Sequence, residues 1–548
     1  MELSNGEEIL MNSGQPGGQS GGQGGVAMKR TLSLTSLTVN AMALIAPGAF
    51  LWTTFQMQAA QTNGGVTTAS EMWTGLLAAL ILAFLTAISY AELAKIYPRA
   101  GSGSSYYFAE AAFLEKEKAV HRQWARIAKF ITGWISHLYY WIYPGIMVAF
   151  SATLIVYILG LFGVSLAIWE QILVAVGFSF VNGYIAYRGI NGSTVTAVII
   201  NAVQLVSLIA FSVLAIIYRQ AHPGLSYATT IPSILIPHNF TSLIYQSTIA
   251  ILLLVGFESV TALGGEAINP KKDIRRAILL SLVIQGAFAY LFEYFAANYL
   301  VSTQLAATDA SGAAVTGYAA AAGSGAPIGD MVRVIGDKML GGSGLALALV
   351  MAATVVVALV GTTLACLNTG VRITYAMSKD KEAPSILGFL HGRFATPYWG
   401  IWVLVVVSAA FGAYGVLNVD NLSQITLASN TGTFLIYGLT NLIAFIAFFG
   451  RAGANFVKNR LVPLLGLLAN TLMLAGVVFL SISSGGSTQR DTVIALAMVG
   501  VWIAAGVVWF ILNTRRQGHP ILTKHEKQLT AADIDDTETR PVTAHGGR

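Results

Sequence analysis

The sequence contains few charged residues and almost no cysteine. Asp, Glu, Lys and Arg make up 10% of the 548 residues, against about a quarter in soluble domains. The single cysteine, Cys366, excludes an internal disulfide and lies in an apolar stretch, so it does not indicate a redox compartment. No metal-ligand cluster, nucleophile–base pair or phosphate-binding loop is recognisable. We therefore expect no enzymatic activity, no catalytic residue, no metal and no cofactor.

Long apolar runs dominate the chain instead. Hydrophobic residues account for 55% of it, and several runs exceed the ~18 residues that can form a membrane-spanning helix. The net charge of +6 is spread over short connections rather than gathered in a patch, so we expect contact with membrane lipid and none with nucleic acid. The first 28 residues lack the basic and apolar regions of a cleavable signal peptide.

The hydrophobic pattern predicts an all-α integral membrane protein with twelve transmembrane helices. The predicted spans are 36–59, 73–96, 127–161, 168–187, 193–218, 242–263, 274–300, 344–376, 398–417, 422–449, 462–482 and 493–512. Lys and Arg concentrate in alternate connections, which are cytoplasmic if both termini are cytoplasmic; only Arg219, Arg333, Lys338 and Arg490 fall outside this rule. In the long external connection 301–342, residues 331–340 could form a short amphipathic helix or belong to a flexible loop.

The sixth predicted span carries polar residues and glycine at its centre: Gly256, Phe257, Glu258 and Ser259. An ionisable group at the bilayer centre costs at least ~2.5 kcal/mol and usually has a function. Glycine allows the helix to unwind, which is tolerated at this depth only where the backbone faces protein or a water-filled cavity. A broken helix around a polar group at the membrane midplane is typical of the binding site of a secondary transporter.

Three stretches resemble amino acid–polyamine–organocation (APC) permeases. They are residues 256–278, residues 369–384 followed by Thr396-Pro397, and residues 90–107. The resemblance extends over residues 32–515. It implies a leucine-transporter-type core of ten helices, built as a 5+5 inverted repeat with discontinuous first and sixth helices. This core corresponds to residues 32–449, and 450–513 would form two additional helices. Residues 1–31 and 514–548 would be a disordered N-terminal and a C-terminal tail in the cytoplasm.

The same resemblance predicts a break in the first span, and Pro47-Gly48 could supply it. The family's usual Gly-Ser-Gly is replaced here by Ala46, Pro47 and Gly48, which removes one backbone donor and one hydroxyl. Backbone N–H groups of Gly48, Ala49 and Phe50 would bind a substrate carboxylate at a helix N-terminus. Carbonyls around Gly256–Ser259 would accept from the substrate ammonium, and Phe257 would cover the substrate. A simple kink and ordinary packing are the alternatives.

Candidates for ion coupling lie in the fifth, sixth and eighth spans. Some proton-coupled relatives carry a lysine in the fifth span, but Ser207 stands at that position and neither Lys nor Arg occurs between Arg188 and Arg219. Ser207, Thr362 and Thr363 could coordinate Na⁺ or join helices by hydrogen bonds. Glu258 could bind a proton, because a carboxyl group withdrawn from water favours its neutral form. A structural role for Glu258 is the alternative.

The sequence therefore predicts a permease of the cytoplasmic membrane that moves an amino acid by alternating access, with H⁺ or Na⁺ as coupling ion, by symport or exchange. An amine, polyamine or cationic amino acid carrier is one alternative, and a sensor that binds an amino acid without transporting it is another. Neither the sequence nor the resemblance fixes the oligomeric state. Side-chain selectivity would depend on candidates in the third, eighth and tenth spans: Tyr140, Tyr143, Asn368, Ser429 and Asn430.

Overall fold

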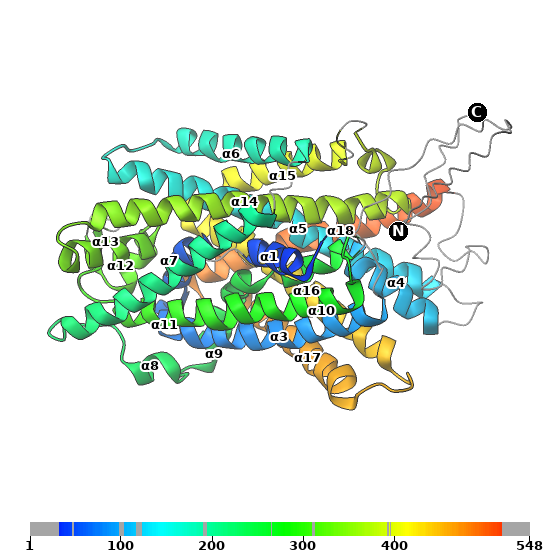
Figure 1. Ribbon diagram of the computed structural model, residues 1–548, viewed down its shortest axis with the longest axis horizontal. Helices are drawn as coiled ribbons and strands as arrows, with labels where there is room; N and C mark the ends of the chain where they lie inside the picture. The colour runs from blue at the N-terminus through cyan, green and yellow to red at the C-terminus, as the bar shows by residue number, and fades with distance from the viewer. Residues whose placement is uncertain are drawn as a thin grey trace, which may run out of the picture.

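The computed structural model describes residues 32–45, 49–97, 103–116, 123–189, 194–264, 266–308, 313–391, 394 and 396–517. This part of the chain is almost entirely helical (Figure 1). The α-helices are α1 (Leu34–Ile45), α2 (Ala49–Ala60), α3 (Met72–Ile96), α4 (Ser105–Lys116), α5 (Gln123–Leu161), α6 (Ile168–Arg188), α7 (Thr194–Ala221), α8 (Ile231–Leu235), α9 (Phe240–Ala250), α10 (Pro270–Ser281), α11 (Leu291–Leu300), α12 (Tyr318–Gly323), α13 (Pro327–Met339), α14 (Gly344–Lys379), α15 (Tyr398–Gly415), α16 (Val419–Phe448), α17 (Val462–Ser483) and α18 (Gly486–Gln517).

Shorter elements interrupt or connect these helices. Four are 3-10 helices: η1 (Ala69–Glu71), η3 (Ile251–Leu254), η4 (Phe257–Leu263) and η6 (Ser385–Gly388). Two are π-helices: η5 (Leu282–Tyr290) and η7 (Val457–Leu461). Strands β1 (Thr62–Asn63) and β2 (Val66–Thr67) form one antiparallel pair, and β3 (Ala306–Thr308) and β4 (Ala314–Thr316) form another.

Eleven helical segments of the described chain are long and apolar enough to cross a membrane. The first predicted span is instead two helices of 12 residues each, α1 and α2. Large apolar side chains on the outer helices are exposed, among them Val206 of α7, Ile482 of α17 and Val501 of α18. Such surfaces suit contact with lipid. The structure thus confirms a helical membrane protein, while the count of twelve and the inverted repeat stay predictions.

The two ends of the bundle differ (Figure 1). Helices α12 and α13 lie at one end, which we call the α13 end, and α4 and the last turns of α18 lie at the other, the α4 end. Of the two alternatives for residues 331–340, a short helix or a flexible loop, the structure shows the helix, α13, which begins four residues earlier, at Pro327. Its apolar side chains, such as Met331 and Ile335, are buried, while Arg333 and Lys338 are exposed.

The sixth span is discontinuous, as predicted. It consists of α9, the 3-10 helix η3, an extended residue at Val255, a turn at Gly256 and the 3-10 helix η4. The seventh span is also irregular, because η5 is a nine-residue π-helix between α10 and α11. Irregular backbone in the membrane requires partners within the protein. The break of the sixth span is accordingly buried among α1, α3, α14 and α16, whereas η5 packs one face against α1, α3 and α7 and exposes Val283 and Phe288 on the other.

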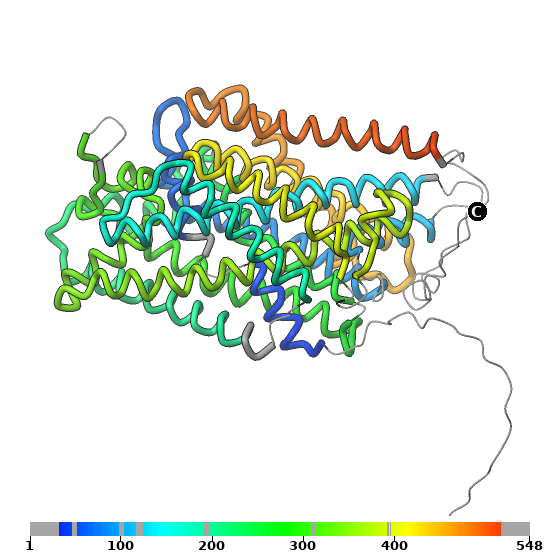
Figure 2. Tube along the Cα trace, turned by 90° about the horizontal axis from the view of Figure 1, so that it is seen from above, coloured from blue at the N-terminus to red at the C-terminus, as the bar shows by residue number. Residues whose placement is uncertain are grey.

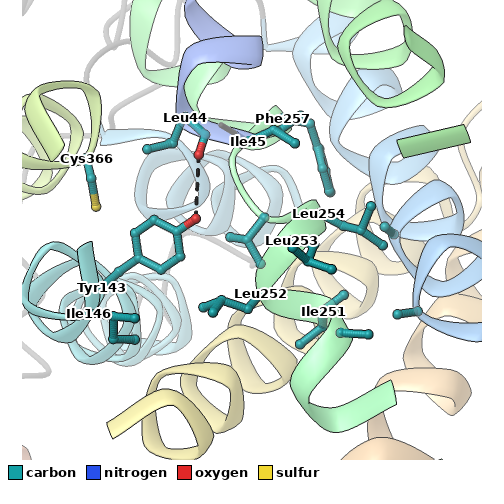
Figure 3. Close-up of a cluster of buried hydrophobic side chains, with 14 of the residues drawn as sticks. Leu44, Ile45, Tyr143, Ile146, Ile251, Leu252, Leu253, Leu254, Phe257 and Cys366 are labelled. Atoms are coloured by element: carbon teal, nitrogen blue, oxygen red, sulfur yellow. Dashed lines mark hydrogen bonds between the residues drawn. The ribbon is translucent and has the colours of Figure 1, made fainter. Parts of the chain in front are cut away.

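The best-buried part of the bundle surrounds these irregular segments. Helix α5 packs against α14, α15 and α16, and Figure 3 shows apolar side chains of α1, α5 and η3 converging beside the break in the sixth span. Helices α17 and α18 pack against α16, and Figure 2 shows α18, in red, along one side of the molecule. Helix α18 continues to Gln517, four residues past the predicted start of the C-terminal tail.

Candidate functional site

Gly256 brings the break in the sixth span against the end of α1. Its backbone adopts φ +130°, which side-chain-bearing residues rarely adopt. A Cβ atom built on Gly256 would lie 2.9 Å from the backbone N of Ile45 and 3.0 Å from the carbonyl carbon of Leu44. Glycine is therefore required here both by the turn and by the close approach of two backbones. The break in the sixth span is thus in contact with the end of α1, directly before the first-span segment predicted to bind substrate.

The last carbonyl groups of α1 accept hydrogen bonds from three other spans. Thr362 Oγ1 of α14 donates to the Ala43 carbonyl at 2.8 Å, and Tyr143 of α5 donates to the Leu44 carbonyl at 3.5 Å (Figure 3). The Tyr290 hydroxyl, at the end of η5, donates to the Ile45 carbonyl at 2.7 Å. A helix C-terminus leaves carbonyls unpaired and carries partial negative charge. This end of α1 is thus a buried acceptor surface that hydroxyl groups satisfy in this conformation.

Glu258 is buried and fully engaged by hydrogen-bond donors. Its carboxyl oxygens accept from the Tyr140 hydroxyl at 3.2 Å, the Tyr437 hydroxyl at 2.9 Å and the Gly256 backbone N–H at 3.0 Å. Tyr140 belongs to α5 and Tyr437 to α16, so Glu258 links the broken span to both helices. These three donors satisfy the oxygens of a carboxyl group that is withdrawn from water. In this conformation Glu258 holds the unwound segment in place.

Phe257 and Ser259 flank Glu258 and are also buried. The Phe257 ring packs against Tyr90 of α3 and Tyr437, with centroid distances of 6.1 and 5.4 Å. Ser259 directs its hydroxyl to the Gly256 carbonyl at 2.6 Å, and its N–H donates to the same oxygen at 3.0 Å. The Gly256 carbonyl, which we expected to accept from a substrate ammonium, is therefore occupied by Ser259 in this conformation.

The predicted selectivity residues are distributed unevenly around the breaks. Besides Tyr140 and Tyr143, Asn430 of α16 reaches the sixth span and donates to the Thr248 carbonyl at 2.7 Å. Ser429 is buried, and its hydroxyl has no hydrogen-bond partner among the described residues. Asn368 lies on a half-buried face of α14. Four of these five candidates are thus buried, and only Asn368 is half-buried.

The three hydroxyl groups proposed to coordinate Na⁺ have separate partners. Ser207 lies on a partly exposed face of α7 and donates to the Val203 carbonyl at 2.9 Å. Thr363 donates within its own helix, to the Leu359 carbonyl at 2.6 Å. Thr362 alone bridges to α1, as described above. Of the three hydroxyl groups in the Na⁺ hypothesis, that of Thr362 therefore contacts another helix in this conformation, whereas those of Ser207 and Thr363 donate within their own helices.

The predicted carboxylate site lies mostly outside the described residues. Ala46, Pro47 and Gly48 are not among them, and of Ala49 and Phe50 only the helical backbone is described. Helix α2 begins at Ala49, directly after this segment. The predicted break at Pro47-Gly48 itself therefore lies outside the described residues.

Comparison with known proteins decides the family. A family model described as amino acid permease matches residues 38–517. This chain belongs to the amino acid permease family. The permease is 23% identical to the low-affinity putrescine importer PlaP of Escherichia coli over 501 residues, which are 90% of this chain and 96% of PlaP. It is 28% identical to the branched-chain amino acid permease BcaP of Lactococcus lactis over 354 residues, 62% of this chain and 67% of BcaP.

A third relative is the methylthioribose transporter of Bacillus subtilis, 21% identical over 508 residues, which are 91% of this chain and 96% of that protein. The relatives are transporters with different substrates. The permease is accordingly a multi-pass membrane transporter, as the APC resemblance implies, and neither the family nor these relatives indicate an enzyme.

Ion pairs near the α4 end of the permease join the segment after the sixth span to α14, and α10 to α3. Arg372 of α14 contacts Glu266, just after η4, at 2.7 Å, and Arg275 of α10 contacts Glu92 of α3 at 3.4 Å. Asn459 also donates to Glu92, at 3.1 Å. These contacts indicate structural roles for Glu266, Arg275, Glu92 and Arg372 at this end of the bundle.

A second charged cluster lies beside them. Lys129 of α5 bridges Glu110 of α4 and Asp380 after α14, at 2.8 and 2.6 Å. Arg126 contacts Glu382 at 2.8 Å. Burial raises the pKa of the Glu382 carboxyl, and the Arg126 charge opposes this rise. These pairs tie the start of α5 to the end of α14.

Sequence analysis missed several polar residues at the site, chiefly Tyr437, Tyr90 and Tyr290. A signal existed for Tyr437, which follows Asn430 by seven residues and therefore shares its helix face. Tyr90 is the first residue of the stretch 90–107, which resembles the APC permeases, but the resemblance implied no role for this residue. Tyr290 could not be placed, because the π-helix before it changes the helix face on which it lies.

Proposed function

We propose that this permease transports α-amino acids across the cytoplasmic membrane by alternating access, coupled to protons or by exchange. The observation that carries the proposal is the contact between Gly256 and the last residues of α1. This contact supports the proposal because it brings the break in the sixth span against the end of α1, among buried polar groups. A transporter needs such a site, reachable from either side in turn.

The helix ends at this site suit a zwitterion. Helix α2 begins at Ala49, so its free N–H groups and positive dipole end would bind a carboxylate. The α1 carbonyls of Ala43, Leu44 and Ile45 form a negative end that would bind an ammonium group. An α-amino acid carries both groups a short distance apart. The substrate ammonium would then compete with, or join, the hydroxyl groups that now bind these carbonyls.

Glu258 is the proposed coupling residue at this site. Three donors bind its carboxyl oxygens in the present conformation, and a change in its protonation would alter the links to α5 and α16. Proton binding would then be tied to movement of the broken span. Sodium coupling through Thr362 is the alternative, since its hydroxyl already reaches the end of α1.

A carrier of amines is the second candidate function. The relative PlaP is named as a putrescine importer and aligns with 90% of this chain. The buried carboxylate of Glu258 would attract a cationic substrate. However, its oxygens are occupied by two tyrosine hydroxyls and a backbone N–H. We therefore place the α-amino acid first.

A thermal-shift screen tests both candidates. Purified full-length protein would be heated with each proteinogenic amino acid and with putrescine, spermidine and cadaverine, with and without Na⁺. A ligand at about a hundred times its dissociation constant stabilises a protein by ~2.7 kcal/mol, which shifts the melting temperature measurably. Stabilisation by zwitterionic amino acids supports the proposal. Stabilisation by the amines alone identifies an amine carrier, and radiolabelled uptake in proteoliposomes would then confirm transport.

A further inference from the structure

The permease contains a buried carboxyl group that its proposed transport site does not use. Glu293 lies in α11 and is 0% exposed. Neither of its oxygens has a hydrogen-bond partner among the described residues. A buried carboxylate without donors or a counter-charge is strongly unfavourable in apolar surroundings. The group therefore needs a ligand of its own.

Glu71, another buried acidic residue near the α13 end, serves as a comparison because its carboxyl group has hydrogen-bond donors. Glu71 is 1% exposed. It accepts from the backbone N–H groups of His238 and Asn239, at 2.8 and 3.2 Å, and from the Thr74 hydroxyl at 2.6 Å. The exposed fraction of Glu71 is close to the 0% of Glu293, but the carboxyl oxygens of Glu71 accept from three donors. The missing donors at Glu293 are therefore a local feature and not a general consequence of burial.

The hydroxyl groups next to Glu293 on the same span are directed elsewhere. Tyr290, three residues earlier, donates to the Ile45 carbonyl at the end of α1, at 2.7 Å. Tyr294, the next residue, donates to the side-chain oxygen of Gln58 in α2. These two phenols bind both halves of the interrupted first span. Glu293 thus lies between two contacts that would change if α1 or α2 moved.

The described part of the chain brings no cation to Glu293. The elements that pack against α11 are α3, α7, α8, α13 and η5, and α2 joins them through the Phe55 and Tyr294 rings at 6.1 Å. None of these elements places a charged group in contact with Glu293, and the titratable groups beside it are the phenols of Tyr290 and Tyr294. A sodium ion or an ammonium group would need several oxygen donors. A proton needs one oxygen.

We propose that Glu293 is a proton-binding site, separate from Glu258, that holds a proton while the helices pack as in this structure. Movement of α2 or α11 that admits water would allow the carboxylate to form and the proton to leave. The preceding π-helix η5 supports such a movement, because π-helical segments have strained hydrogen bonding and occur often at functional sites. The site does not depend on which solute the permease carries.

Infrared difference spectroscopy on the full-length protein, without substrate, tests the proposal. Spectra recorded between mildly acidic and alkaline pH should show a protonated-carboxyl band that persists at neutral pH. Glu293→Gln should remove this band, and the matched change Glu71→Gln should leave it, because the oxygens of Glu71 already have three hydrogen-bond donors. A band unchanged in Glu293→Gln would overturn the proposal. Loss of the band in both variants would also overturn it, since it would report general repacking.

Thermal unfolding provides a second measurement. A carboxyl group that is neutral when folded and ionised when unfolded makes stability fall as pH rises above the ordinary carboxyl range. Glu293→Met should flatten this fall and match or exceed the wild-type melting temperature at alkaline pH, because no donor is left unpaired. Glu71→Met should lower the melting temperature at every pH, because three donors lose their acceptor. An unchanged pH slope in Glu293→Met would contradict a proton on Glu293, whether or not the amino acid screen succeeds.

Discussion

Gly256 shows how one residue sets the geometry of the site. The positive φ at this position and the 2.9 Å approach to the Ile45 nitrogen both exclude a side chain. A residue forced into such a backbone conformation costs on the order of 1–3 kcal/mol. The contact is with backbone atoms, which cannot rotate away as a flexible side chain can. The glycine therefore fixes the distance between α1 and the sixth span.

We expect Gly256→Ala to abolish most uptake and to lower stability by about 1–3 kcal/mol. The matched control is Gly177→Ala in α6, where an added Cβ meets nothing within 4 Å. That change should be neutral or stabilising by up to ~1 kcal/mol, because alanine favours a helix. Uptake and thermal unfolding of both variants give the answer. Wild-type uptake by Gly256→Ala would show that the contact is not needed.

A second prediction at this scale concerns Glu258. Glu258→Gln mimics the protonated acid, so it should retain substrate binding and exchange but lose accumulation driven by a pH gradient. Tyr437→Phe removes one donor at 2.9 Å and should weaken binding while keeping the response to pH. Counterflow and gradient-driven uptake in proteoliposomes distinguish these effects. Full pH-driven accumulation by Glu258→Gln would shift the coupling role to Na⁺ or to simple exchange.

At the scale of elements, α1 is attached to the segment after the sixth span. Leu32 pairs with the backbone of this segment through two hydrogen bonds of 3.0 Å, with the Glu266 carbonyl and the Ile268 N–H. The Glu266 side chain in turn contacts Arg372 of α14 at 2.7 Å. These contacts join the start of the first span to the end of the sixth span at the α4 end. We infer that α1 and this segment move together during transport.

The Arg372–Glu266 pair offers a test of this linkage. Arg372→Glu should place two negative charges together and reduce uptake strongly, and Glu266→Arg should do the same. The double exchange should restore part of the activity, with a coupling energy on the order of 1 kcal/mol for such a partly exposed pair. Uptake and thermal unfolding of the three variants form the cycle. Strictly additive losses would mean that the pair does not act as a unit.

At the scale of the whole molecule, the two ends of the bundle differ in charge. Lys271 and Lys272 lie beyond the end of the sixth span, while α13 covers the opposite end. Basic residues favour the cytoplasmic side of a membrane. We therefore expect the α4 end to face the cytoplasm and the α13 end to face outward.

Cysteine labelling tests this orientation. In a Cys366→Ser background, single cysteines at Asn63 and Lys338 should react with an impermeant reagent in intact cells. Cysteines at Lys271 and Ser385 should react only after the membrane is opened. All four positions are exposed or half-exposed in the structure, so each should be accessible from its own side. Reversed labelling at any position would refute the predicted topology.

The sequence alone determined the membrane class, most of the helical segments and the interruption of the sixth span. Apolar runs and charged connections are local signals, because each span must bury its own backbone in lipid. The Gly256–Ser259 motif marked one break for the same reason, since glycine and a carboxyl group are costly inside a span. The short helix in the connection 301–342 also followed from its local pattern.

Only the tertiary structure decided which side chains meet between the spans. Glu258 and Glu293 look alike in the sequence, as single acids in apolar stretches. Packing gives the first three donors and the second none. The rotation and depth of each helix fix such contacts, and here a π-helix turns Tyr290 and Glu293 toward their final positions. Neither quantity is encoded in the hydrophobic periodicity of a single span, because both depend on the neighbours against which it packs.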